Sequence, residues 1–192
     1  MKKNILIIDG HPRNKSFSDS WASSYHQGAA RNFNVTRISL RDLKFNPNLE
    51  NGYKIVMPLE KDLIQAQEQM MSADHIVIIT PIWWAGPPAL LKGFFDRVML
   101  PGFAFKYRPN SIYWDKLFQG KSGHLVVTSD GPSWWTQWLR GDSAVKMIKL
   151  GVLDFIGVKP VKVTRYGDMK STSNDKIIKY LKAAYVMGEK GF

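Results

Sequence analysis

Residues 75–88 read HIVIITPIWWAGPP, and this stretch decides how the rest of the chain is interpreted. Its first part, His75 to Thr80, is the most apolar run in the sequence, which is typical of a strand buried in a parallel sheet. The part from Thr80 to Pro88 is rich in proline and contains two adjacent tryptophans. An indole buries a large apolar area when it is covered, so we expect something flat or apolar to cover Trp83 or Trp84.

Apolar runs alternate with helical patterns on both sides of this stretch. Strands are predicted at residues 4–8, 35–40, 75–80, 124–128 and 161–163. Helices are predicted at 20–31, 58–71 and 88–99, from Asp142 or Ser143 to about 155, and from a cap at Asn174 onward. This order predicts one three-layer α/β domain over residues 1–192, a five-stranded parallel sheet with helices on both faces.

Two details of the predicted helices can be checked in a structure. Ser18 or Asp19 is expected to cap the first helix, because short polar side chains accept hydrogen bonds from the first helical N–H groups. In the second helix, Leu59, Leu63, Ile64 and Met70 are expected on one side.

Composition excludes several kinds of chemistry. The 192 residues include no cysteine, so disulfides, thiolate metal sites and thiol catalysis are ruled out, and no metal-ligand spacing appears elsewhere. The first apolar run is too short for a secretory core or a membrane span, which suggests a cytoplasmic protein. The net charge of +11 is dispersed along the chain. It therefore suggests anionic small ligands rather than a nucleic-acid partner.

In parallel α/β sheets, ligands bind beyond the carboxyl ends of the strands, where the strand order reverses. The loop after the first strand, GHPRNKSFSDS, contains His11, Ser16 and Ser18 and leads into a helix. A helix N-terminus with nearby hydroxyl groups suits a phosphate, but the same residues suit a polar turn with a helix cap. Neither G-x-G-x-x-G nor G-x-x-x-x-G-K-[ST] is present, so the usual dinucleotide fingerprint and a P-loop are not supported.

The loops after the third and fourth predicted strands read PIWWAGPP and SDGPSWWTQW. In the first of them, one indole is expected to pack in the core. The second supplies hydroxyls, a backbone N–H at Gly131 and two more tryptophans. Aromatic walls that meet backbone donors and a phosphate cradle fit a flat, phosphorylated cofactor, and a flavin mononucleotide or dinucleotide matches that description.

Residues 81–98, PIWWAGPPALLKGFFDRV, match the pattern P-L-x-W-x-x-x-P-A-x-L-K-G-W-x-[DE]-R-V, and GFAF at 102–105 follows it. The opening GHP and SFS segments and the later DFIGV at 154–158 also fit. Through these motifs the chain resembles the NAD(P)H:quinone oxidoreductase (DT-diaphorase-like) family of flavodoxin-fold flavoproteins.

The resemblance implies a flavin site, with FAD favoured over FMN. It places the first loop at the flavin phosphate, the second along the isoalloxazine ring and the third over the pyrimidine end of the ring. Trp84 is then expected to be scaffold, and the backbone around Trp83 to be covered by the flavin. The implied cofactor-binding residues are His11, Ser16, Phe17, Ser18, Pro81, Ile82, Trp83, Trp84, Ala85, Thr128, Ser129, Asp130 and Gly131.

The chain departs from the family pattern after the third loop. Trp135 falls near a family tyrosine and Arg140 falls on a family histidine, while Asp130 replaces a glycine. Trp135 and Arg140 are therefore the candidate catalytic residues. A permanently protonated arginine can hold an anionic reduced flavin by charge, but it cannot relay a proton.

The resemblance also implies an activity and an assembly. NAD(P)H would deliver a hydride to the flavin, and a quinone or similar small acceptor would then take it in a ping-pong reaction. The family forms homodimers with the active site at the interface. Phe105 and Tyr107 match the residues that complete the partner's substrate pocket, although the same segment could be an apolar brace. The alternative function is a flavin-binding regulatory partner of a membrane potassium-efflux system.

Overall fold

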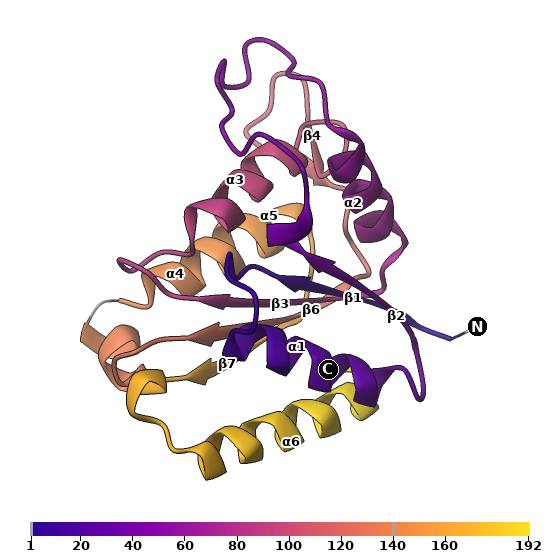
Figure 1. The fold of residues 1–192 in the computed structure, drawn as a ribbon. Helices are drawn as coiled ribbons and strands as arrows, with labels where there is room; N and C mark the ends of the chain where they lie inside the picture. Colours follow the sequence, from indigo (N-terminus) through magenta and orange to yellow (C-terminus); the bar gives the residue numbers. More distant parts are fainter. Residues whose placement is uncertain (1, 140) are drawn as a thin grey trace.

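A five-stranded parallel sheet in the order β2-β1-β3-β6-β7 forms the centre of the computed structural model, which describes residues 2–139 and 141–192 (Figure 1). The strands are β1 (Asn4–Asp9), β2 (Asn34–Ser39), β3 (His75–Pro81), β6 (Ser122–Thr128) and β7 (Val161–Tyr166). The predicted parallel sheet is confirmed. Its last strand runs three residues beyond the predicted end at 163, because residues 161–166 all pair with β6.

Helices cover both faces of this sheet, as the sequence predicts. α1 (Phe17–Ala29) and α6 (Asn174–Lys190) lie on one face (Figure 1). On the other face lie α2 (Lys61–Ser72), α3 (Ala89–Val98), α4 (Ser143–Lys146) and α5 (Asp154–Ile156). A π-helical segment, Met147–Leu153, joins α4 to α5, so this part of the chain is helical from residue 143 to residue 156.

The apolar run in β3 has a direct structural reason. Every residue of the strand is buried. Ile76 and Ile78 face the core beneath α2 and α3, whereas Val77 and Ile79 face the core beneath α1 and α6. Since successive side chains of a strand point to opposite faces, only a strand covered on both faces is apolar at consecutive positions.

Three predicted details at helices are wrong. α1 begins at Phe17 and its cap is Ser16, whose Oγ accepts from the N–H of Asp19 at 3.2 Å, so neither Ser18 nor Asp19 is the cap. The last helix is capped by Ser173 rather than Asn174. In both cases the true cap is the serine with extended backbone just before the helix. Ile64 is 48% exposed and does not join the buried side of α2.

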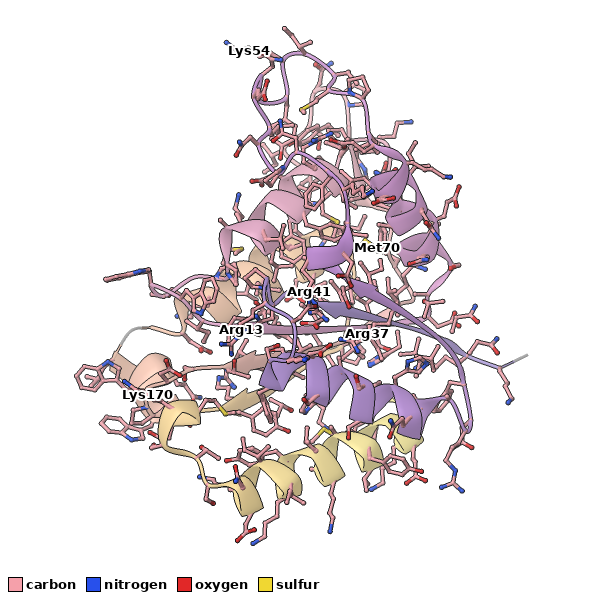
Figure 2. All side chains as sticks on the ribbon, in the orientation of Figure 1. Arg13, Arg37, Arg41, Lys54, Met70 and Lys170 are labelled. Carbon is pink, nitrogen blue, oxygen red and sulfur yellow. The ribbon has the colours of Figure 1, made fainter. Side chains whose placement is uncertain are left out.

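Two further features lie at the outer end of the molecule. One is a two-stranded antiparallel sheet of β4 (Phe105–Tyr107) and β5 (Trp114–Lys116). The other is the long connection 43–60, whose tip is marked by Lys54 in Figure 2. The buried side chain of Arg97 ties this connection to α3 by donating to the carbonyl oxygens of Asn46 and Pro58 at 2.5 and 2.8 Å.

Candidate functional site

The second loop is a tight two-residue turn. The N–H of Trp83 donates to the carbonyl of Gly86 at 2.8 Å, and the N–H of Gly86 returns a bond to the carbonyl of Trp83 at 2.9 Å. The two central residues, Trp84 and Ala85, have φ of 50° and 61°. Such turns favour Asn-Gly, because other residues are strained at positive φ. A Trp-Ala pair in this conformation is therefore a strained element of the kind that clusters at functional sites.

This turn overturns the expectation that Trp84 is scaffold. Its side chain lies at the tip of the turn and is 99% exposed. Trp83 is 47% exposed and meets the ring of His11 edge to face, with 5.8 Å between the ring centroids. Neither indole is in the core, because a two-residue turn projects beyond the sheet edge that the helices cover.

A pocket of about 290 Å³ lies between the second and third loops. Its volume is close to the lower end of the range of small-molecule sites, roughly 300–1,000 Å³. Both loops and the start of α4 line it. The lining residues are Ile82, Trp84, Ala85, Ser129, Asp130, Gly131, Trp135, Asp142, Ser143 and Ala144.

Hydrogen bonds hold the walls of this pocket together. The N–H of Ile82 donates to the carbonyl of Thr128 at 2.8 Å and so joins the ends of β3 and β6. Ser143 Oγ donates to the carbonyl of Ala85 at 2.7 Å and ties the second loop to α4. The N–H of Ser129 donates to the carbonyl of Tyr166 at 2.9 Å, which fixes the start of the third loop against β7.

The predicted site residues fall into groups. Ile82, Trp84, Ala85, Ser129, Asp130, Gly131 and Trp135 line the pocket together. Pro81 and Thr128 are buried at the ends of β3 and β6, behind the lining. Trp135 is 43% exposed and meets Trp134 edge to face at 5.8 Å. Arg140 lies outside the described residues.

The first loop, residues 10–16, lies beside the second loop, because the ring of His11 contacts the ring of Trp83. Ser16 caps α1, so the cap interpretation is correct for that residue. Ser18 is 1% exposed, and its Oγ has no hydrogen-bond partner among the described residues. An unpaired buried hydroxyl is unfavourable unless a ligand satisfies it, and the first N–H groups of a helix also lack intrahelical partners. These donors fit a phosphate oxygen.

His11 and Phe17 complete this loop. Burial lowers the pKa of His11, so the imidazole is neutral at pH 7, and its Nδ1 accepts from the N–H of Arg13 at 3.0 Å. Phe17 packs edge to face on Tyr166 and Tyr180, with centroids 5.5 and 6.2 Å apart. The loop is thus anchored by aromatic contacts from β7 and α6.

Phe105 and Tyr107 are not near the pocket between the second and third loops. Both line a separate, more apolar cavity of about 400 Å³, beneath β4 and beside α3 and α5. Phe105 is only 8% exposed and packs in the core as an apolar brace. Tyr107 is 64% exposed. Within one chain, therefore, neither residue reaches the pocket between the second and third loops.

Sequence patterns did not indicate Asp142 and Ala144 as pocket residues, nor Arg165 beside them. Asp142 has φ of 55° and does not cap α4 by its side chain; its carboxylate instead pairs with the guanidinium of Arg165 on β7. Asp142 was interpretable only as a cap, because its partner lies 23 residues away. The spacing of apolar residues along the sequence does not indicate a contact between residues so far apart.

Two negative findings apply to residues 2–139 and 141–192. No group of three or more histidine, aspartate or glutamate side chains is placed to hold a metal ion. In the same residues, no helix has the length and hydropathy that crossing a bilayer requires.

The strand order, the covered sheet and the pocket at its carboxyl edge define a flavodoxin-like α/β protein. Residues 3–186 match the family described as Flavodoxin-like fold, and the chain belongs to it.

Relatives within that family have related names. A protein of Haemophilus influenzae named "Uncharacterized NAD(P)H oxidoreductase" is 37% identical over 173 residues, which are 86% of this chain and 84% of that protein. The human "Ribosyldihydronicotinamide dehydrogenase [quinone]" is 35% identical over 184 residues, 82% and 78% of the two chains. The "FMN-dependent NADH:quinone oxidoreductase" of Beijerinckia indica is 28% identical, covering 87% and 89%. These relatives assign the chain to the oxidoreductases.

Proposed function

We propose that the protein is a flavin-dependent oxidoreductase that passes a hydride from NAD(P)H to a quinone or similar small acceptor. The observation that carries this proposal is the convergence of three loops at one sheet edge. One loop offers unpaired phosphate donors at Ser18 and the start of α1, and the other two enclose a pocket with indole walls. Indole walls suit planar rings, and helix N-termini suit phosphates.

The first loop would hold the phosphate, and the second and third loops would hold the ring system. When bound, the flavin supplies the hydride chemistry. FAD and FMN both carry the phosphate that the first loop fits; FAD is the expectation from the resemblance, and the Beijerinckia relative is named for FMN. The protein's own residues would bind the flavin and orient its ring.

The pocket walls suggest how donor and acceptor are used. Trp84 and Trp135 present flat apolar surfaces on which a nicotinamide or a quinone ring can stack. The flavin ring would itself fill much of a pocket of about 290 Å³, so donor and acceptor would stack in turn on its exposed face, as a ping-pong reaction requires. Asp130 is exposed in the lining and disfavours anionic acceptors. Arg140 remains a proposed source of positive charge near the ring.

A second copy of the chain is the proposed partner. The hairpin of β4 and β5 and the connection 43–60 lie at the outer end of the molecule (Figure 1), and large apolar side chains are exposed on both. They include Tyr53, Val56, Tyr107, Ile112 and Tyr113, each at least 64% exposed. An exposed apolar surface of this kind usually marks an interface, and twofold dimers are the commonest assembly. No contact favours the potassium-efflux alternative, and it is not proposed.

The proposed function is tested by adding FMN and FAD to the purified protein and following flavin fluorescence. We expect at least one flavin to bind and be quenched. The complex should oxidise one equivalent of NADH or NADPH by itself and should turn over further only when a benzoquinone is present to accept the hydride. Sedimentation of the same sample should give a dimer. Protein that quenches neither flavin would refute the flavin site. A fully active monomer would refute the assembly alone.

The strained turn gives a second test. Replacing Trp84 with asparagine and Ala85 with glycine supplies the residues that the turn prefers, so we expect the flavin-free protein to gain about 1–2 kcal/mol of unfolding free energy. The same change removes an indole wall of the pocket, so NAD(P)H oxidation should fall. Urea unfolding and steady-state rates measure the two effects.

The control for this variant is Asn110→Gly. Asn110 also has positive φ, 53°, but lies in the hairpin between β4 and β5, outside the pocket lining. We expect it to leave the rate unchanged. A double variant that gains stability and keeps its full rate would show that Trp84 does not contact the reacting molecules.

A further inference from the structure

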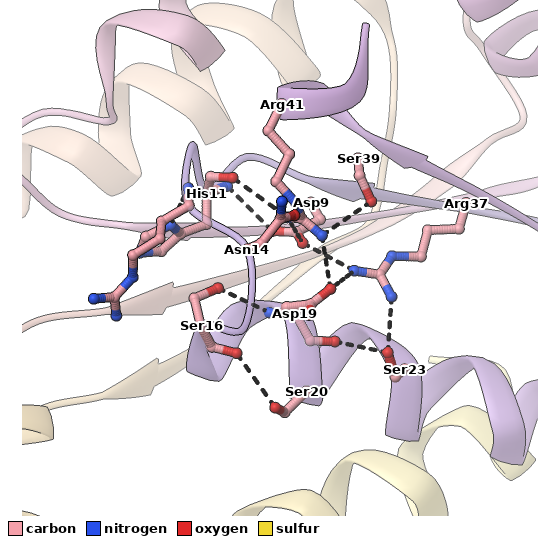
Figure 3. Close-up of polar contacts among 11 residues, drawn as sticks. Asp9, His11, Asn14, Ser16, Asp19, Ser20, Ser23, Arg37, Ser39 and Arg41 are labelled. Carbon is pink, nitrogen blue, oxygen red and sulfur yellow. Dashed lines mark hydrogen bonds and ion pairs between the residues drawn. The ribbon is translucent and has the colours of Figure 1, made fainter.

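Two acidic and two basic side chains meet beneath the first loop, where β1 ends (Figure 3). Asp9 is completely buried. Its Oδ2 lies 2.6 Å from Nη1 of Arg41 and 2.9 Å from Nη2 of Arg37. The Arg41 side chain is 8% exposed, so this contact is shielded from water. Breaking a buried ion pair by removing one partner is strongly destabilising, because a charge is left uncompensated.

Asp19, in the first turn of α1, closes the cluster. Its Oδ1 lies 2.7 Å from Nη2 of Arg41 and 2.5 Å from Nη2 of Arg37. Burial alone would raise the pKa of Asp19, but the hydrogen bond from Arg37 and the charges of both arginines lower it. Burial likewise opposes the charge on Arg41, but the hydrogen bond and charge of Asp9 raise its pKa. Each arginine therefore contacts both carboxyl groups.

Arg41 also forms hydrogen bonds with the first loop. Its Nε donates to Oδ1 of Asn14, and its Nη1 lies 3.4 Å from the carbonyl oxygen of His11 (Figure 3). Asp9 Oδ1 accepts from the N–H of His11 at 3.1 Å. The start and the middle of the loop are thus held by the same two buried side chains.

The loop needs such support because its backbone is strained at Lys15. Lys15 has φ of 54°, a conformation that L residues other than glycine adopt only when their surroundings enforce it. On one side of Lys15, the side chain of Asn14 is held by Arg41. On the other side, Ser16 is fixed as the cap of α1. The two anchors together hold the turn that leads into the first N–H groups of the helix.

We propose that Arg41 is a positioning residue for the flavin phosphate. It does not contact the phosphate; it holds the loop from His11 to Ser16 in the shape that presents the start of α1, Phe17 and Ser18, to one phosphate. This inference rests on the proposed flavin site. Its consequence is a preference for flavins that carry a phosphate, FMN and FAD, over riboflavin, which has the same ring and no phosphate.

The test compares the dissociation constants of FMN, FAD and riboflavin for the wild type and Arg41→Ala, measured by flavin fluorescence. We expect the preference of the wild type for FMN over riboflavin to fall on the order of ten- to a hundredfold, the range for hydrogen bonds to a charged group. Arg41→Lys should recover only part of it, because an ammonium cannot bond Asp9, Asp19 and Asn14 in one plane.

Arg97→Lys is the matched control. Arg97 is another buried arginine, 2.9 Å from Glu60, and it holds a different loop. We expect its replacement to lower stability but to leave the ratio of FMN to riboflavin affinity unchanged. Should Arg41→Ala not fold, Asn14→Ala removes only the hydrogen bond between Arg41 and the exposed side chain of Asn14. We then expect the ratio of FMN to riboflavin affinity to fall by a smaller factor.

The outcomes separate the two proposals. A wild type that binds no flavin refutes both of them. A wild type that prefers FMN, with variants at Arg41 and Asn14 that keep the same ratio, refutes the positioning role and leaves the flavin site standing. An equal loss of FMN and riboflavin affinity would also refute it, because that is the effect of a merely structural residue.

Discussion

Replacing Gly188 with alanine is expected to destabilise the protein by about 2 kcal/mol or more, although alanine is the better helix former. Gly188 lies in α6 where this helix crosses α1. A Cβ at this position would lie 2.1 Å from the carbonyl oxygen of Tyr25 and 2.8 Å from the backbone nitrogen of Ala29. Backbone atoms cannot rotate away as a side chain can. The helices would have to separate.

The crossing is reciprocal, so Gly28→Ala should have the same effect. A Cβ on Gly28 would lie 2.0 Å from the carbonyl oxygen of Tyr185. Alanine in a helix interior gains about 1 kcal/mol over glycine, whereas overpacking typically costs about 1–3 kcal/mol and occasionally more. Because both clashes are with backbone and much closer than any real Cβ contact, we expect the upper end of that range and a net loss.

Urea unfolding of the flavin-free protein measures this effect, with Gly151→Ala as the control. Gly151 also lies in a helical segment, but a Cβ there would meet nothing within 4 Å. We expect this control to be neutral or slightly stabilising. If Gly28→Ala and Gly188→Ala were as stable as the control, the close approach of α1 and α6 would be incorrect. Since α1 begins at the phosphate loop, both variants should also weaken FMN binding.

Lowering the pH from 6.5 to 4.5 is expected to remove about 5 kcal/mol of stability through two buried histidines. His75 on β3 is 3% exposed and His124 on β6 is completely buried. Burial lowers the pKa of each to about 4, with smaller contributions from the positive charges of Lys3 and Lys162. Each ring has one nitrogen bonded at 2.8 Å, to Ser122 or Thr164.

The direction of this effect follows from proton uptake by the two states. An unfolded chain takes up protons at these two histidines near pH 6.5, whereas the folded protein takes them up there only near pH 4. Between these values the unfolded state binds more protons, so stability rises with pH. The contribution is complete above pH 6.5 and is lost as the pH falls. At 1.36 kcal/mol per pH unit, two units correspond to about 2.7 kcal/mol for each histidine and about 5 kcal/mol for the two.

Urea unfolding between pH 8 and pH 4.5 tests this prediction with the double variant His75→Asn, His124→Gln. These amides keep a polar atom near Nδ1 of His75 and Nε2 of His124, the nitrogens that are bonded. We expect the variant to lose much less stability than the wild type over the acidic range. Measurements at pH 8, where the histidines are neutral in both states, give the packing cost separately. Equal slopes in the two proteins would contradict the assignment.

The sequence alone predicted the features that depend on local pattern or on general topology. Consecutive apolar residues such as Ile76 to Ile79 indicate a strand covered on both faces, because side chains alternate along a strand. Strands that alternate with helices imply a parallel sheet, and carboxyl ends of parallel strands share one edge. The convergence of the second and third loops was therefore predictable from the sequence.

Only the tertiary structure decided contacts between residues far apart in the sequence. Asp9 pairs with Arg37 and Arg41 because the register of β1 and β2 places Asp9 opposite Ser39. Asp142 meets Arg165 because the third loop returns over β7. The exposure of Trp84 follows from the bonds between Trp83 and Gly86. No periodicity contains this information, since strand register, loop closure and helix crossing depend on the packing of the whole chain.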